Sequence, residues 1–184
     1  MKGSIAKAEE LVKEKSYYMP MQFDNPENPN IHELTTGPEI ISAMNGIGKS
    51  VDAFVAGVGT GGTLSGIGRA LKKENPNTKV YALEPSESPL LKDGKTGKHG
   101  IAAGFIPKNL DKDVYDGIVE VSTDEAMKIA CEVAKNEGFL PGIFAGANIH
   151  GAIELAKKLG KGHAAVTVSP DGGDRYLSTA LFNE

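Results

Sequence analysis

Hydrophobic and polar residues along the chain follow two periods, and together they predict a succession of helices and strands. Apolar residues at helical spacing begin almost at the first residue and predict an opening amphipathic helix on Ile5, Ala8, Leu11 and Val12. Prolines and asparagines in the stretch MPMQFDNPENPN exclude a helix or a central strand, so we expect a loop there. Beyond the stop at Gly37-Pro38, a short helix is expected on Ile40, Ile41 and Met44.

From Val51 onward the pattern becomes regular. Strands are expected in VDAFVAGV, KVYALEP, DGIVEV and HAAVTVSP, and helices in the apolar-periodic segments between them. One of these helices has a capping box, formed by Ser122 and Glu125. Strands and helices that alternate with short links are typical of the α/β class, so we expect a mostly parallel, twisted sheet covered by helices on both faces.

A glycine-rich segment, GVGTGGT at residues 57–63, joins the first of these strands to the next helix, and we call it the glycine loop. In α/β sheets ligands bind beyond the carboxyl ends of the strands, where a helix N-terminus favours an anion. Residues without a Cβ let the main chain approach phosphate oxygens, and Thr60 and Thr63 add hydroxyl donors. A phosphate site is therefore the favoured interpretation, and a tight, closely packed turn is the alternative.

The phosphate could belong to either of two classes of ligand. Gly57, Gly59 and Gly62 fit the G-x-G-x-x-G pattern of dinucleotide-binding folds, and Glu84 closes the next strand, where such folds place the carboxylate that binds a ribose. This combination would make an NAD site. The same glycines fit a cradle for a single phosphate equally well.

Composition narrows the function classes further. The net charge of -4 and the pI near 5.6 argue against nucleic acid or an anionic membrane as a partner, so small-molecule chemistry is favoured. No signal peptide or membrane-spanning apolar run is evident, and a cytoplasmic protein is expected. No metal site is expected either, because the histidines lack metal-ligand spacing and are interpreted as surface or helix residues at positions His32, His99, His150 and His163.

Four segments in this order resemble one enzyme family: GVGTGGTLSGIGR, EPSESPLL, AAGFIPKNLD and SPDGGDRYLSTALF. They are similar to the C-terminal part of cysteine synthase (O-acetylserine sulfhydrylase), a pyridoxal-phosphate enzyme with the tryptophan-synthase β-like fold. The upstream segment MQFDNPENPNIHELTTGPEI is also similar, so the resemblance covers essentially the whole chain. It implies a chain truncated at its N-terminus, with residues 1–50 a remnant of the smaller subdomain and linker, and residues 51–184 the α/β domain that binds the cofactor phosphate.

The resemblance also implies roles for individual residues. In the family the G-T-G-G-T loop binds the phosphate of the cofactor, which corresponds here to Gly59, Thr60, Gly61, Gly62 and Thr63. The family's Q-F pair, whose glutamine contacts the substrate carboxylate, corresponds to Gln22 and Phe23, and the glycine of the substrate-facing loop to Gly100. Near the cofactor ring the family's P-D-S-G-E-R reads PDGGDR, so Gly172 replaces a serine whose hydroxyl meets the pyridine nitrogen.

The reaction that the resemblance implies is β-replacement, in which sulfide takes the place of the acetate of O-acetylserine and L-cysteine forms, with pyridoxal phosphate as the electron sink. The family holds the cofactor on a lysine within S-x-K-D-R and binds substrate with a T-S-G-N-T-G loop. Neither motif occurs in these 184 residues, so no catalytic residue is assigned and the chain alone is expected to be catalytically incomplete. Two further segments differ from the family. KHGIAAGF is three residues shorter than its family counterpart, and the family's G-I-S-S-G reads GIFAG, so Phe144 and Ala145 stand in place of two serines.

Three hypotheses follow. In the first, the chain is the C-terminal portion of a cysteine synthase whose upstream part is supplied elsewhere. In the second, it is a non-catalytic binding module, docking for example on an intact synthase. In the third, it is an NAD-binding domain. Separately, the resemblance implies a homodimer, because family members are homodimers.

Overall fold

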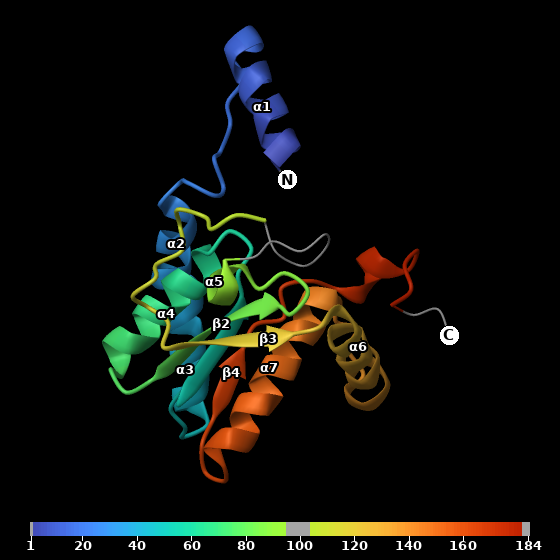
Figure 1. The fold of residues 1–184 in the computed structure, drawn as a ribbon. Coiled ribbons are helices and arrows are strands. Elements are labelled where there is room, and N and C mark those ends of the chain that lie inside the picture. The colour runs from blue at the N-terminus through green and yellow to red at the C-terminus, as the bar shows by residue number, and fades with distance from the viewer. Residues whose placement is uncertain (1, 95–103, 182–184) are drawn as a thin grey trace.

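The computed structural model describes residues 2–94 and 104–181 of the 184-residue chain. Within these ranges a four-stranded sheet lies at the centre, with the order β3-β2-β1-β4, and every pair of neighbouring strands is parallel (Figure 1). This arrangement confirms the expected parallel α/β sheet. Its strands are β1 (Ala53–Gly57), β2 (Lys79–Pro85), β3 (Gly117–Val121) and β4 (Ala165–Thr167).

Helices precede, connect and follow these strands. Among the described residues they are α1 (Lys2–Lys15), α2 (Glu27–Ile31), the π-helix η1 (His32–Thr36), α3 (Gly37–Gly46), α4 (Gly62–Glu74), α5 (Leu90–Asp93), α6 (Thr123–Glu137), α7 (Ile143–Leu159) and the 3-10 helix η2 (Gly173–Tyr176). None of them is long and apolar enough to cross a bilayer.

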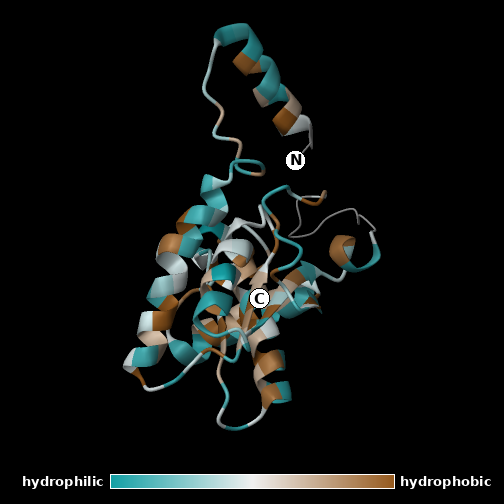
Figure 2. Ribbon diagram, turned by 90° about the vertical axis from the view of Figure 1, so that its left-hand side faces the viewer, coloured by the Kyte–Doolittle hydropathy of each residue, from teal (hydrophilic) through white to brown (hydrophobic). Residues whose placement is uncertain are grey.

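Alternate residues of β1 point into two separate hydrophobic cores. Phe54 and Ala56 pack with α4 on one face, against Leu64, Ile67 and Leu71. On the opposite face Ala53 and Val55 pack with α6 and α7, through Ala126, Ala147 and Leu155. Successive side chains of a strand lie on opposite faces, so a strand covered on both sides is apolar throughout, as VDAFVAGV predicts. Figure 2 shows that hydrophobic and hydrophilic residues alternate along the helices.

Residues 27–46 form one nearly continuous helical segment, and here the sequence expectation is wrong at two points. α2 begins inside the stretch expected to be a loop, because Pro26 at its N-cap and Pro29 in its first turn occupy positions where no intrahelical N–H is needed. The chain also does not stop at Gly37-Pro38. Gly37 donates its N–H to the carbonyl of His32, five residues back, and this widened turn accommodates Pro38 in the first turn of α3.

α6 begins as the sequence predicts. The Ser122 hydroxyl accepts a hydrogen bond from the Glu125 N–H at 3.2 Å, and the Glu125 carboxylate accepts one from the Ser122 N–H at 2.9 Å. Both halves of the expected capping box are therefore present, and two of the otherwise unpaired N–H groups at the start of this helix are satisfied.

The predicted opening helix, α1, stands clear of the sheet and its covering helices (Figure 1). The extended segment that follows α1 carries two non-glycine residues with left-handed backbone, Ser16 at φ 53° and Met21 at φ 59°. Between α1, residues 19–24 and residues 105–108 lies an apolar groove of about 500 Å³.

Candidate functional site

The glycine loop leaves the sheet at the end of β1 and turns sharply into α4. Gly61, the N-cap of α4, has a left-handed backbone with φ 82°, which L-residues with a side chain rarely adopt. A Cβ on Gly61 would lie 2.8 Å from the backbone N of Leu110, and one on Gly62 would lie 1.9 Å from Oδ1 of Asn28. Both glycines are therefore required by close backbone approach and, at Gly61, by conformation.

Gly59 has different surroundings, because a Cβ added there would meet nothing within 4 Å. The residue is exposed at the carboxyl edge of the sheet. Next to it α4 begins at an N-cap residue, Gly61, that has no side chain to cap the helix, although the Gly62 N–H donates to the Thr60 hydroxyl. Uncapped N–H groups and the positive end of the helix dipole attract an anion, so the glycine loop has the properties of a phosphate site.

The Thr60 hydroxyl accepts two hydrogen bonds, one from the side-chain amide of Asn28 at 3.1 Å and one from the Gly62 N–H at 3.3 Å. A hydroxyl has one proton and two lone pairs, so two accepted bonds leave the proton of Thr60 available as a donor. Thr60 can thus supply the hydroxyl donor that the sequence indicated.

Thr63 is held by His32, a contact that the sequence analysis missed. His32 Nε2 lies 3.2 Å from Oγ1 of Thr63, and its Nδ1 lies 2.9 Å from Oγ1 of Thr36. Burial lowers the pKa of His32, which favours a neutral ring between the two hydroxyls. The interpretation of His32 as a surface or helix residue is therefore incomplete: it is on a helix, but it lies behind the glycine loop.

Gln22 and Phe23 are far from the glycine loop in sequence, but in the structure the side chain of Asn28 connects Gln22 to it. The main-chain carbonyl of Gln22 accepts hydrogen bonds from the side-chain amides of Asn28 at 2.7 Å and Asn109 at 2.9 Å. The Phe23 ring packs edge-on against Phe105, with centroids 5.0 Å apart. The Gln22 side chain is exposed and borders the apolar groove beside α1.

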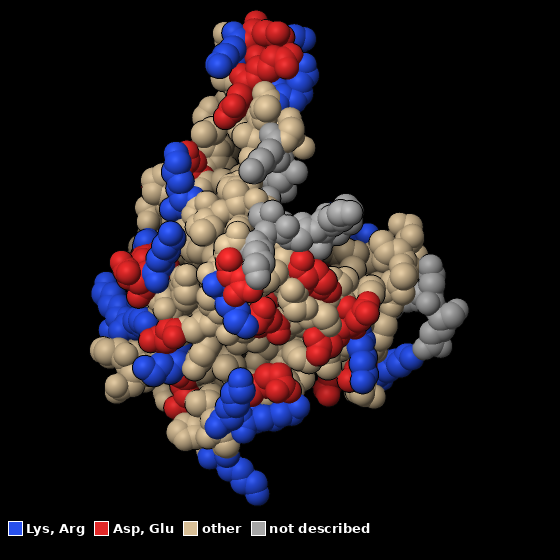
Figure 3. Space-filling view, in the orientation of Figure 1, with Lys and Arg blue, Asp and Glu red and all other residues tan. Residues whose placement is uncertain are grey.

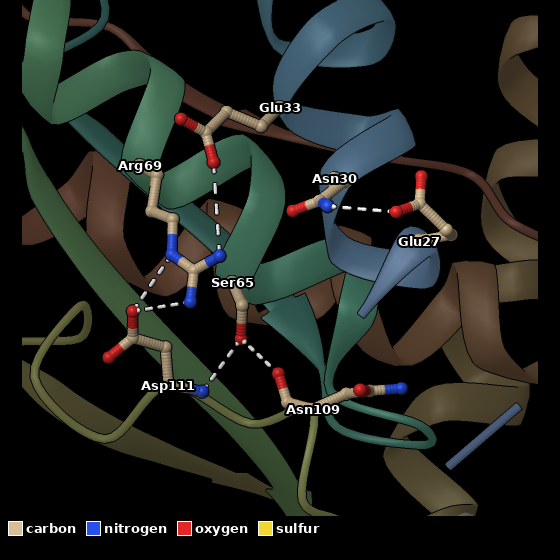
Figure 4. A network of polar contacts seen from close by, with 7 residues as sticks. All are labelled: Glu27, Asn30, Glu33, Ser65, Arg69, Asn109 and Asp111. Atoms are coloured by element: carbon tan, nitrogen blue, oxygen red, sulfur yellow. Dashed lines mark hydrogen bonds and ion pairs between the residues drawn. The ribbon is translucent and has the colours of Figure 1, made fainter. Parts of the chain in front are cut away.

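A buried hydroxyl holds residues 109–111 against α4. Ser65 donates to the carbonyl of Asn109 at 3.0 Å and accepts from the N–H of Asp111 at 2.9 Å. One turn further along α4, Arg69 pairs with Asp111 at 2.8 Å, and at 3.8 Å with Glu33 (Figure 4). These contacts fix the backbone of Leu110 behind Gly61.

On the other side of the glycine loop, a small cavity of about 50 Å³ reaches the N-terminus of α7. Its lining is largely apolar, and among the residues are Gly57, Gly59, Phe144, Asn148 and Pro170. The buried Asn148 accepts from the Gly57 N–H at 2.9 Å and donates to the Val168 carbonyl at 2.9 Å, so it ties the ends of β1 and β4 together. Phe144, which replaces a hydroxyl residue of the family motif, is partly exposed here.

Gly172 lies just beyond this cavity, where it forms an isolated bridge with Pro141. Its neighbour Asp171 accepts hydrogen bonds from the N–H groups of Phe144 and Ala145 at 3.1 and 2.7 Å, and from the Tyr176 hydroxyl at 2.7 Å. Desolvation, together with the bond to Asp171, raises the pKa of Tyr176 to about 12. Asp171 therefore occupies the anion-attracting end of α7.

Glu84, the residue that the dinucleotide interpretation needs for a ribose, is 2% exposed and already paired. Its two carboxylate oxygens accept from the N–H groups of Leu91 and Lys92 at 2.6 and 3.0 Å, at the start of α5. The geometry therefore gives Glu84 a structural role and weakens the case for an NAD site.

Two further features complete the description of the site. Gly100 and His99 fall outside the described residues. Among residues 2–94 and 104–181, no three His, Cys, Asp or Glu side chains are grouped as a metal would require. On the face drawn in Figure 3, lysines and arginines lie among aspartates and glutamates over the body of the molecule.

A parallel α/β sheet whose first strand leads through a glycine-rich turn into a helix is the arrangement found in many proteins that bind nucleotides or phosphate-bearing cofactors. Comparison with known families makes the class specific: residues 1–171 match the family of pyridoxal-phosphate dependent enzymes, and the chain belongs to that family.

Individual relatives agree with this assignment. A cysteine synthase of Staphylococcus aureus is 54% identical over 186 residues, covering 100% of this chain and 59% of that protein. A probable cysteine synthase of Bacillus subtilis is 46% identical over 187 residues, covering 100% and 60%. The chain therefore spans about three fifths of the length of these relatives.

Solved structures share the fold. A hydrogen sulfide-producing enzyme of Fusobacterium nucleatum superposes with a TM-score of 0.93 at 43% identity, over 99% of this chain and 56% of that one. Isoform 3 of O-acetylserine sulfhydrylase from Entamoeba histolytica gives 0.92 at 40% identity, over 100% and 55%. The resemblance to the cysteine synthase family and the expected tryptophan-synthase β-like fold are thus confirmed.

Proposed function

We propose that this chain binds the phosphate of pyridoxal 5'-phosphate in its glycine loop, through Gly59, Thr60, Gly61, Gly62 and Thr63. The observation that carries the proposal is the turn into α4, where the N-cap residue Gly61 has no side chain and space lies open beside Gly59. The free proton of Thr60 adds a donor. Membership of the pyridoxal-phosphate dependent enzymes supplies the identity of the phosphate compound.

We propose further that the protein serves the cysteine synthase reaction, the formation of L-cysteine from O-acetylserine and sulfide. The bound cofactor would supply the electron sink of a β-replacement. Gln22 would bind the substrate carboxylate, and Phe23, packed on Phe105, would keep the Gln22 backbone in place. Gly100 would face the substrate, and Gly172 would lie by the cofactor ring without offering it a side chain. The similarity to the Staphylococcus aureus cysteine synthase supports this choice of reaction.

This chain by itself is proposed to hold the cofactor phosphate without turning over substrate. A lysine in the family's S-x-K-D-R surroundings and a T-S-G-N-T-G loop are both absent from its 184 residues. We propose that residues 51–184 form the phosphate-binding domain, that residues 1–50 belong to the smaller subdomain and linker, and that the chain works in the cytoplasm as a homodimer or docked on an intact synthase.

Isothermal titration tests the phosphate site directly. Pyridoxal phosphate and pyridoxal are titrated separately into the purified chain, with NADH as a third ligand. Saturable binding of pyridoxal phosphate, with at least tenfold weaker binding of pyridoxal, is the expected result. Equal affinity for the two pyridoxal compounds would overturn the phosphate assignment, and tighter binding of NADH would restore the dinucleotide alternative.

Co-expression tests the proposed incompleteness. The chain is produced alone and together with the N-terminal segment of the Staphylococcus aureus cysteine synthase that its match does not cover. Cysteine formation is expected from the pair and not from either part. Turnover by the chain alone would contradict the proposal, whereas phosphate binding without activity in either preparation would favour the non-catalytic binding module.

A further inference from the structure

Asn28, in the first turn of α2, contacts both segments of the candidate site. Its side-chain Nδ2 donates to the Gln22 carbonyl at 2.7 Å and to the Thr60 hydroxyl at 3.1 Å. A side-chain amide has two N–H donors, so these two bonds use both of them. One amide group therefore joins the segment of residues 19–24, which carries Gln22, to the glycine loop.

The bond to Thr60 determines which way the Thr60 hydroxyl points. Because Oγ1 of Thr60 accepts from Asn28 and from the Gly62 N–H, its own proton is directed away from both. Without the Asn28 donor the hydroxyl could turn. With a carboxylate in place of the amide, the Thr60 proton would be drawn toward that carboxylate and away from a bound anion.

Close packing prevents the Asn28 amide from moving away. Its Oδ1 lies over the first residue of α4, at 1.9 Å from the place of a Cβ on Gly62. In the next turn of α4 a Cβ on Gly66 would lie 2.1 Å from the carbonyl oxygen of Pro29, the residue after Asn28. Gly62 and Gly66 lie on one face of α4, and because neither has a side chain, α2 can pack close enough to α4 for the Asn28 amide to make its hydrogen bonds.

We propose that Asn28 is a positioning residue that couples the two halves of the site. It directs the Thr60 proton toward a bound phosphate and holds the Gln22 main chain at a fixed place relative to that phosphate. The inference rests on the proposed function, because it takes the glycine loop to be the phosphate site. It deepens that proposal by naming one side chain that is hydrogen-bonded both to the glycine loop, at Thr60, and to the Gln22 carbonyl.

Nuclear magnetic resonance of the wild-type chain gives a first test without substitution. Inorganic phosphate, and then pyridoxal phosphate, is added to isotope-labelled protein. We expect shifts of the Gly59 and Thr60 backbone signals, of the two Asn28 side-chain amide protons, and of the Phe23 N–H, which shares a peptide group with the Gln22 carbonyl. The side-chain amide of Asn30, which faces Glu27 at 3.3 Å, serves as the internal control and is expected to stay unchanged (Figure 4).

The outcomes separate the two proposals. If no signal in the glycine loop responds to either ligand, the proposed phosphate site fails. If Gly59 and Thr60 respond while Asn28 and Phe23 do not, the phosphate site stands and the coupling role of Asn28 is overturned.

A matched pair of variants gives the second test. Asn28→Asp and Asn30→Asp add the same charge two residues apart in α2, but only the first faces Thr60. The dissociation constant for pyridoxal phosphate is expected to rise about tenfold or more in Asn28→Asp and less than threefold in Asn30→Asp. The Phe23 N–H shift on phosphate binding is expected to disappear in Asn28→Asp only. Equal effects of the two variants would mean that the added negative charge alone weakens binding, and would overturn the positioning role of Asn28.

Discussion

Gly59 and Gly62 belong to the same loop, yet their surroundings give them separate roles. The place of a Cβ on Gly62 is filled by the Asn28 amide, whereas the space beside Gly59 is open. The sequence alone predicts the same phosphate-binding role for both, because a glycine pattern indicates where the backbone is flexible but not which atoms pack against it. The two roles can be separated by adding a single methyl group at each position.

Gly62→Ala is expected to lower the free energy of unfolding by about 1–3 kcal/mol, since the methyl group would overlap Oδ1 of Asn28. Gly59→Ala is expected to change it by less than about 0.5 kcal/mol while weakening pyridoxal phosphate binding at least tenfold. Urea denaturation and isothermal titration of both variants measure the two effects. Native-like stability of Gly62→Ala would show that α2 can retreat from α4.

His32 gives a prediction for pH. Burial lowers its pKa below the ordinary value of 6.5, so the unfolded chain binds more protons than the folded chain between the folded pKa and about pH 6.5. The contribution of His32 to stability is therefore complete above about pH 6.5 and declines as the pH falls toward the folded pKa.

Urea denaturation at pH 5.0 and 7.5 should show a smaller pH effect in His32→Gln than in the wild type, because glutamine does not titrate. An identical pH dependence in the two proteins would mean that the ring between Thr36 and Thr63 is not held neutral by its burial.

At the level of elements, strands and helices from Val51 onward follow the sequence prediction because each apolar pattern matches one covered face of the sheet. The predictions fail where a residue that breaks a helix in its interior is tolerated in its first turn. The sequence pattern predicts that the prolines end or exclude a helix. In the structure Pro26 and Pro29 lie at the N-cap and in the first turn of α2, and Pro38 lies in the first turn of α3, directly after the π-helix η1. His32 and Asn28 were missed because their contacts join residues 31 and 32 positions apart, which no local pattern records.

The capping box of α6 gives a prediction at this scale. Ser122→Ala removes the acceptor for the Glu125 N–H and the reciprocal arrangement, so it is expected to cost about 1 kcal/mol of stability. Lys128→Ala on the same helix is the control, since its contact with Glu132 is a 3.9 Å surface pair worth less than about 0.5 kcal/mol. Thermal denaturation followed by circular dichroism compares them, and equal melting temperatures would contradict the capping role.

For the whole molecule, the isolation of α1 is the feature with the clearest consequence for stability. α1 stands clear of the sheet, and its Ile5 and Ala8 line the apolar groove together with Met21 and Phe105. The division of the chain at residue 50 stays a prediction, although α3 packs on the core beside α4.

Limited trypsin digestion is expected to cut first within or just after α1, at Lys13 or Lys15, and to leave a resistant fragment that contains α2 onward. Mass spectrometry of the digest identifies the fragment. Initial cleavage near residue 50 would instead support the predicted domain boundary at residue 50 as the more exposed site. Addition of the complementing cysteine synthase segment is expected to protect the cleavage sites in α1.

β1, the strand that leads into the glycine loop, is flanked on one side by β4, and Ala53 is paired in register with Ala165. During synthesis on the ribosome, β1 emerges long before this neighbour, whose bonds to β1 join residues 112 positions apart. Until β4 arrives, one edge of this buried strand is open to other nascent chains. A chain that stops before Ala165 would keep this edge of β1 unpaired, and we expect such a product to aggregate more readily than the chain that contains β4.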